Sequence, residues 1–234
     1  MNHLRQQFPV WGTIVDVDIA SSLVSEDGLN QGMQQVIDFC KQVDSDFSTY
    51  IDTSWVTRLR TNQIEITSCP PSVQEVWELC LQAKHLTDGA FDPWAVEGGF
   101  DPSGLVKGWA AEVGAQMLVE AGIENVLINA SGDIVLRGGK PDGGPWNIGI
   151  ASPDDVEKYV KFFDVTDGSV ATSGDYENPS VDATKWALLA EGANAAYTPT
   201  TSSHWASPAP TTIFQAIDRI AAAVYGLLSN TAIP

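Results

Sequence analysis

Positively charged residues are scarce in this sequence. Its 234 residues include 12 lysines and arginines against 30 aspartates and glutamates, which gives a formal net charge of −18 at pH 7. A surface of this sign repels phosphate backbones and anionic lipid headgroups, so we expect neither nucleic acid nor a membrane surface as a partner. An anionic ligand would need a local feature to hold it: a helix N-terminus, a well-placed lysine or a divalent cation.

Cysteine motifs and long apolar segments are also missing. The three cysteines, Cys40, Cys69 and Cys80, are odd in number and show no Cys-x-x-Cys or Cys/His spacing, so neither a disulfide framework nor a zinc site is indicated. Residues 1–10 lack the apolar core of a signal peptide, and no stretch reaches the roughly 18 apolar residues of a membrane span. These features predict a cytoplasmic protein without a membrane segment.

Apolar residues at helical spacing predict three helices. The first carries its apolar stripe over residues 33–47. The second follows a pair of prolines, has Ser72 as its expected N-cap, and ends near residue 87. The third covers residues 105–121 and is closed by Gly122.

Short β-rich runs surround these helices. A strand is expected over residues 14–19, where apolar and polar residues alternate. After the third helix, glycine-containing turns separate further runs at residues 126–129, 134–137, 146–150, 160–163 and 169–172. Helices followed by a meander of strands predict an α+β fold with a mixed or antiparallel sheet and packed helices.

The last part of the chain differs in composition from the rest. Residues 178–234 contain only five charged side chains, together with runs of proline, serine and threonine. One helix is expected near residues 212–228, and the remainder has the composition of loop or disorder. We therefore expect one domain over residues 1–177, followed by a divergent, partly disordered C-terminal segment.

The segment from Asp101 to Glu112 has the chemistry of an anion site. A turn-forming Asp-Pro-Ser-Gly sequence leads into the third helix, so free backbone N–H groups and the positive end of the helix dipole would face a ligand. Lys107 would supply a charge for a phosphate oxygen, and Gly104 lets the backbone approach a ligand or metal closely. The alternative is an ordinary helix start, in which Asp101 caps the helix and Lys107 is solvated.

Two further segments place aromatic residues in expected loops. In residues 47–59, Tyr50 or Trp55 would stack on a flavin or adenine ring, or would simply cover the core. Residues 87–94 form an acidic turn with aromatic neighbours after a helix stop, and an ordinary capped loop has the same composition.

Two strand ends complete the set of candidate sites. Residues 129–133 are small and polar, so their backbone amides would come close to a ligand, although a plain hairpin fits equally well. At residues 169–174 an apolar strand ends in the hydroxyls of Thr172 and Ser173, which would bind phosphate or merely form a turn.

In sequence order, these segments resemble the motifs of the ApbE family, the FAD:protein FMN transferases. The similar blocks lie at residues 9–13, 47–59, 87–93, 101–109, 129–133 and 170–174. The resemblance implies a single flavin transferase domain of the T-fold type over residues 1–177. It also implies a magnesium-dependent (Mg²⁺) enzyme that cleaves FAD, transfers FMN to a threonine or serine hydroxyl of a target flavoprotein, and releases AMP.

The resemblance further implies roles for individual residues. Trp11 and Tyr50 would line the flavin site, and Asp101 and Lys107 would contact FAD. The backbone carbonyl of Gly104 would be a ligand of the magnesium ion. Further cofactor-binding residues come from two other blocks: Ala90, Phe91, Asp92, Thr172 and Ser173. No catalytic residue is identified.

The C-terminal part departs from the family's pattern. After Tyr176 the family usually continues with a His-x-x-Asp-Pro-x-x-Gly block and an Ala-Asp-Ala-x-x-Thr block, which provide a histidine near the flavin and ligands for the metal. Neither is found: His204 is followed by Trp-Ala-Ser, and residues 228–234 contain no acid. Two alternatives therefore stay open beside the transferase: an FAD-binding protein without transfer activity, and an FAD pyrophosphatase.

Overall fold

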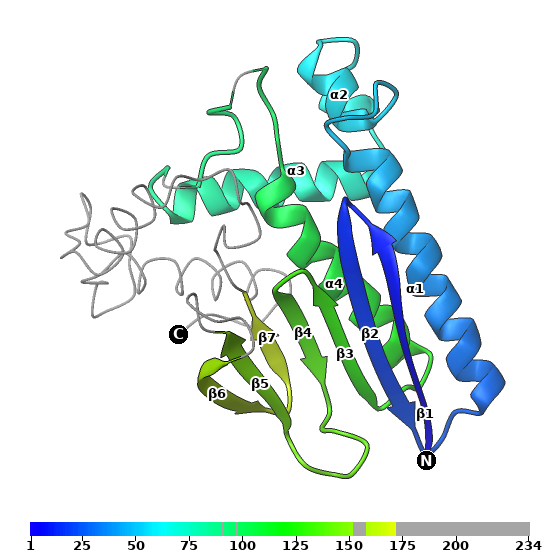
Figure 1. Ribbon diagram of the computed structural model, residues 1–234. Helices are drawn as coiled ribbons and strands as arrows, with labels where there is room; N and C mark the ends of the chain where they lie inside the picture. The colour runs from blue at the N-terminus through cyan, green and yellow to red at the C-terminus, as the bar shows by residue number, and fades with distance from the viewer. Residues whose placement is uncertain (90, 97, 152–157, 172–234) are drawn as a thin grey trace.

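The computed structural model of the protein describes residues 1–89, 91–96, 98–151 and 158–171. Helices cover one face of an antiparallel sheet, which confirms the predicted α+β fold (Figure 1). The elements follow the chain in this order: β1 (Asn2–Val10), β2 (Thr13–Ser21), α1 (Glu26–Phe47), α2 (Trp55–Arg60), the 3₁₀ turn η1 (Ile66–Ser68), α3 (Pro71–Leu86), α4 (Ser103–Glu120), β3 (Asn125–Ala130), β4 (Asp133–Arg137), β5 (Trp146–Ala151), β6 (Tyr159–Val165) and β7 (Gly168–Val170).

The larger sheet has the strand order β1-β2-β3-β4-β7, and every neighbouring pair is antiparallel. The predicted runs at residues 126–129 and 134–137 are β3 and β4, and the described part of the run at 169–172 lies in β7 and the residue after it. Strands β5 and β6 pair with each other in a separate two-stranded sheet. Of the two predicted sheet types, mixed and antiparallel, the described residues form the antiparallel one.

A tight hairpin joins β1 to β2. Its two turn residues, Trp11 and Gly12, have φ angles of 56° and 69°, as in a type I′ turn, whose twist matches that of the strands. The indole Nε1 of Trp11 donates a hydrogen bond to the carbonyl oxygen of Cys40 at 3.1 Å, which fixes the turn against α1. Strand β1 was not predicted, because the polar residues 5–7 interrupt its apolar alternation and its outer face is exposed.

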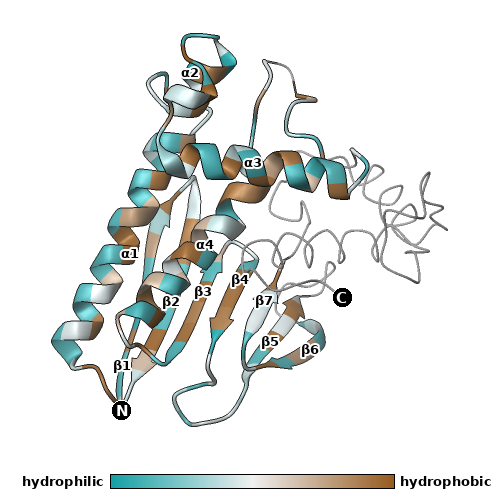
Figure 2. Cartoon of the chain, turned by 180° about the vertical axis from the view of Figure 1, so that it is seen from behind, coloured by the Kyte–Doolittle hydropathy of each residue, from teal (hydrophilic) through white to brown (hydrophobic). Residues whose placement is uncertain are grey.

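The main core fills the space between the sheet, α1 and α4. Figure 2 shows apolar residues along β3, β4 and α4. Strand β2 alternates as predicted, with its inward side chains buried against the helices while Asp16 and Asp18 lie on the opposite face. The fully buried centre of this core includes Val15, Val17, Ile19, Met33, Val36, Ala115, Leu118 and Ile128.

The three predicted helices are confirmed as α1, α3 and α4, with corrections at their starts. Helix α1 begins earlier than its apolar stripe, after Ser25, whose side chain accepts from the backbone N of Gly28 at 3.2 Å. The expected N-cap Ser72 is wrong: α3 begins at Pro71, and its N-cap residue is Pro70, whose side chain has no hydrogen-bond acceptor. Proline is favoured at the first helical position because the N–H that it lacks has no partner within the helix. Gly122, with a φ of 84°, ends α4 as predicted.

Helix α2 corrects the expected loop over residues 47–59. The Ser54 side chain accepts from the backbone N of Thr57 at 3.0 Å and so caps this short helix. Six residues are too few for a clear apolar period, so the sequence showed only mixed polar and aromatic residues.

Two predictions on the C-terminal part cannot be compared with the structure. The domain border at residue 177 and the helix at residues 212–228 both lie outside the described residues. Within the described part, no helix has the length and apolar character needed to cross a membrane.

A second, smaller core lies on the sheet face away from the helices. The β5–β6 hairpin packs there, with Trp146 and Ile148 buried against Leu136 of β4. The indole Nε1 of Trp146 donates to the carbonyl oxygen of Gly138 at 2.9 Å. Gly138 has a φ of 60°, and a Cβ atom there would lie 2.3 Å from the carbonyl oxygen of Glu124. The chain can pass from β4 towards β5 along this path only with glycine at this position.

We therefore predict that Gly138→Ala destabilises the protein much more than Gly143→Ala. Both glycines have positive φ, but a Cβ at Gly143 meets nothing within 4 Å. The control should lose about 1–2 kcal/mol through backbone strain alone. Gly138→Ala should lose roughly 3 kcal/mol or more, because the clash adds to the strain. Urea unfolding measures both losses, and equal losses would contradict the role given to Gly138.

Candidate functional site

A pocket of about 450 Å³ lies where three segments meet: the β1–β2 turn, the C-terminal end of α1 with the loop after it, and the N-terminal end of α4. Three of the predicted site residues, Trp11, Tyr50 and Lys107, line it together although they are far apart in the sequence. The size is typical of small-molecule sites. The lining residues are Trp11, Gly12, Val43, Asp44, Phe47, Ser48, Thr49, Tyr50, Ile51, Ser103, Val106 and Lys107.

The aromatic side chains of the pocket differ in exposure. Phe47 is buried, while Tyr50 is 95% exposed. The backbone around Tyr50 is nevertheless held: its N–H donates to the Ser48 hydroxyl at 3.2 Å, and the Ser54 hydroxyl donates to the Ser48 carbonyl at 2.6 Å. Tyr50 therefore does not cover the core, which removes one of the two interpretations. Its ring is free to stack on a ligand.

Trp55, the other aromatic candidate of this segment, is engaged elsewhere. It lies in α2 and is partly buried, and the guanidinium carbon of Arg58 lies 4.7 Å from the centre of its ring. It does not line the pocket. Of the two aromatic candidates, only Tyr50 faces the space where a ligand would bind.

The N-cap residue of α4 is Pro102, so the alternative in which Asp101 caps this helix is not confirmed, although Asp101 still bonds its first residue. The Asp101 carboxylate accepts from the backbone N of Ser103 at 3.0 Å and from its hydroxyl at 2.5 Å, so it holds the helix start and does not line the pocket. Lys107 does line the pocket. Its ammonium group makes no hydrogen bond or ion pair with any residue that the structure describes.

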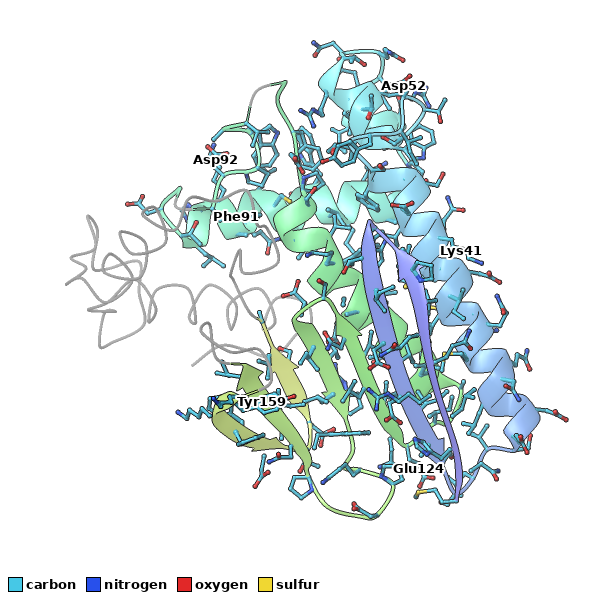
Figure 3. The ribbon with its side chains drawn as sticks, in the orientation of Figure 1. Lys41, Asp52, Phe91, Asp92, Glu124 and Tyr159 are labelled. Carbon is cyan, nitrogen blue, oxygen red and sulfur yellow. The ribbon has the colours of Figure 1, made fainter. Side chains whose placement is uncertain are left out.

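Phe91 and Asp92 lie beside α4 but outside the pocket lining (Figure 3). A Cβ atom on Gly104 would lie 3.0 Å from Cε2 of Phe91, so the glycine lets this ring pack against the first turn of α4. Asp92 forms an ion pair with Lys84 at 2.8 Å and accepts from the backbone N of Trp94 at 3.0 Å. The hydrogen bond with Lys84, followed by that with Trp94, holds the pKa of Asp92 below its usual value.

An aromatic cluster that the sequence analysis missed anchors the loop after Asp92. The rings of Trp77 and Trp94 meet edge to face with centres 5.0 Å apart, and the Phe100 ring lies 4.5 Å from that of Trp77. These contacts fasten both ends of the loop to α3. In the sequence, this cluster could have been predicted from the repeated aromatic residues between positions 91 and 100.

The remaining candidates do not join the pocket. Residues 129–133 form the β3–β4 hairpin, in which Ser131 and Gly132 have positive φ and the Asn129 side chain accepts from the Gly132 N at 2.9 Å. Three predicted residues, Ala90, Thr172 and Ser173, lie outside the described residues.

The described residues do not supply a metal site by themselves. No group of three or more histidine, cysteine or acidic side chains able to hold a metal forms among them. The carboxylate nearest in sequence to Gly104, that of Asp101, already bonds Ser103. A magnesium site at Gly104 therefore stays a prediction from the family resemblance.

Comparison with known proteins gives a family and a fold. The family model described as "ApbE family" matches residues 11–97 and 95–187. The FAD:protein FMN transferase of Vibrio cholerae is 40% identical over 79 residues, covering 33% of this chain and 24% of that protein. The transferase of the same name from Klebsiella pneumoniae is 34% identical over 79 residues, or 33% of this chain and 23% of its own length. These matches span only about a quarter of each relative.

Solved structures share the fold. The flavin transferase ApbE from Vibrio cholerae superposes with a TM-score of 0.64 at 22% identity, covering 77% of this chain and 74% of that one. The ApbE protein from Thermotoga maritima gives a TM-score of 0.68 at 21% identity, covering 77% and 73%. The arrangement of helices and sheet is thus that of known ApbE structures.

The ion pair beside Phe91 yields a prediction on pH dependence. Lys84→Met should raise the pKa of Asp92 towards its usual value, because the largest cause of its lowering is removed while the Trp94 N–H is kept. A carboxyl group whose pKa is lower in the folded than in the unfolded state stabilises the fold at every pH above its unfolded-state pKa. This stabilisation is lost as the pH falls through the pKa of the folded state. Carboxyl NMR titration of both proteins measures the change; an unaltered pKa in the variant would contradict the assignment.

Proposed function

The chain belongs to the ApbE family, and on this premise we propose that it binds FAD in the pocket at the start of α4 and transfers FMN to a hydroxyl of a target flavoprotein. The acceptor would be a threonine or serine, and AMP would leave. The observation that carries the proposal is the meeting of Trp11, Tyr50 and Lys107 in one pocket. The family match over residues 11–187 supports it.

The chemistry of the pocket suits a flavin nucleotide. Trp11, Phe47 and Tyr50 offer aromatic surface for a planar ring system. Lys107 offers a cation without a protein partner in the described residues, near the positive end of the α4 dipole, which suits a phosphate oxygen. In a chain of net charge −18, this local cation is how an anionic ligand would be held.

The proposed reaction is a displacement at phosphorus. The acceptor hydroxyl attacks the phosphorus of the FMN half, the bond from that phosphorus to the bridging oxygen breaks, and the bridging oxygen leaves with AMP while the hydroxyl loses its proton. Such a step depends on alignment and on neutralising the phosphate charge, and Lys107 would contribute to the second. When bound, Mg²⁺ would neutralise further charge on the pyrophosphate. The described residues do not assemble its ligands, so no step is assigned to it.

Two other activities follow from the unusual C-terminal sequence. An FAD-binding protein without transfer would keep the pocket and lack the residues for chemistry, and the absence of the family's usual C-terminal blocks favours it. An FAD pyrophosphatase would use water in place of the acceptor hydroxyl. The cytoplasmic location stays a prediction from the sequence.

One assay separates the three activities. The protein is incubated with FAD, Mg²⁺ and an acceptor domain that carries a threonine of the flavinylated type. We expect flavin fluorescence on the denatured acceptor and release of AMP in equal amount. AMP without labelled acceptor would identify the pyrophosphatase, and FAD binding without either product would identify the inert binder.

The role of Lys107 is tested by binding alone. Lys107→Ala should weaken FAD binding about tenfold or more, because a charge-assisted hydrogen bond to phosphate is lost. Lys41→Ala is the matched control: this lysine is 63% exposed on α1 (Figure 3) and is not one of the pocket-lining residues, so its removal should leave the affinity unchanged. Titration calorimetry measures both. An unchanged affinity in Lys107→Ala would remove the pyrophosphate role from this residue.

A further inference from the structure

The pocket contains a second charged residue that the sequence analysis did not identify. Asp44, in the last turn of α1, provides the one carboxylate among the lining residues, and Lys107 provides the one cation. No ion pair joins the two, and the Asp44 carboxylate makes no hydrogen bond or ion pair with any residue that the structure describes. Two residues of opposite charge thus line one pocket without forming an ion pair with each other.

Neither charge is compensated by the end of the helix that carries it. A carboxylate near a helix C-terminus meets the negative end of the dipole, and the last turn of α1 contains no basic residue to compensate. The neighbouring Asp46 is compensated differently, because its carboxylate accepts from the Gln42 side chain at 3.0 Å. Lys107, in turn, lies near the positive end of α4. Locally unfavourable charges of this kind are expected where a ligand compensates them.

A carboxylate in this pocket restricts which part of a ligand lies beside it. It accepts hydrogen bonds and cannot donate them, so it repels a phosphate and requires an N–H or O–H donor. Val43, Phe47 and Val106 line the same pocket, and apolar walls raise the cost of leaving such a charge unpaired. A ligand that satisfies both charged residues must therefore have an anionic part for Lys107 and a donor for Asp44.

We propose that Asp44 is a specificity-determining residue, and that its carboxylate accepts the hydrogen bond of the N3–H group of the flavin ring. This inference rests on the proposed function and specifies how the ring is recognised. The aromatic residues of the pocket would hold the ring, and N3–H is the single N–H of an oxidised isoalloxazine. Lys107 would hold the phosphate at the other side. Asp44 thereby favours a flavin over a planar ring without such a donor.

The test compares two ligands on two proteins. FAD and N3-methyl-FAD, in which the donor is replaced by a methyl group, are titrated into the wild-type chain and into Asp44→Ala. The wild type should bind the methylated ligand about tenfold or more weakly than FAD, as for the loss of a charge-assisted hydrogen bond. Asp44→Ala should bind FAD more weakly by a similar factor and should no longer distinguish the two ligands.

Two controls separate recognition from folding. Asp38→Ala removes the same charge from an exposed site on the same helix and should leave the preference for FAD intact. Without ligand, Asp44→Ala should unfold at a temperature no lower than the wild type, because the variant removes an uncompensated charge and introduces a better helix former.

The outcomes distinguish this inference from the proposed function. If the wild type binds FAD but Asp44→Ala retains the full preference over N3-methyl-FAD, the role of Asp44 is wrong while FAD binding stands. The role of Asp44 at N3 is also wrong if Asp44→Ala loses affinity for FAD and for N3-methyl-FAD by the same factor. Asp44 would then contact another donor, such as a ribityl hydroxyl. If the wild type binds neither ligand, the proposed function itself fails, and the inference fails with it.

Discussion

The burial of α4 on several sides fixes the geometry on which the site depends. This helix lies between the sheet, α1 and α3, and its buried residues point in every direction around its axis. Glycines allow the close approach: a Cβ on Gly114 would lie 3.1 Å from Ile128, and one on Gly32 of α1 would lie 3.1 Å from Leu118. With α4 held this closely, its N-terminal end is placed beside the C-terminal end of α1, and the pocket forms between them.

This packing also decides which charges face a ligand. The two helix ends bring Lys107 and Asp44 to one space, whereas Asp101 and Asp92 are taken up by Ser103 and Lys84. Although the chain is acidic, these two carboxylates near the site are thus used to stabilise loops and do not face the ligand. A ligand in the pocket therefore meets one cation, one hydrogen-bond acceptor and aromatic surface. A flavin nucleotide can contact all three, through its phosphates, its N3–H group and its ring system.

The sequence predicted the parts of the fold in which one local pattern dominates. The stripe of α1 and the alternation of β2 are long and regular, and both were found where expected. Strand β1 and helix α2 were missed for physical reasons. The outer face of β1 carries polar residues such as Arg5 and Gln7, which bond Asp16 on β2, and α2 is too short to show a period. At the site, Trp11, Tyr50 and Lys107 were found through motifs, but Asp44 belongs to no motif and becomes visible only once α1 and α4 are packed.

The central claim is that FAD binds between the β1–β2 turn and the ends of α1 and α4. A crystal structure of the chain with FAD tests it most directly. The account predicts the isoalloxazine ring between Trp11 and Tyr50, with a phosphate oxygen about 3 Å from Nζ of Lys107, the distance of a charge-assisted hydrogen bond. A dinucleotide bound elsewhere, for example against the β5–β6 hairpin with this pocket left to solvent, would contradict it.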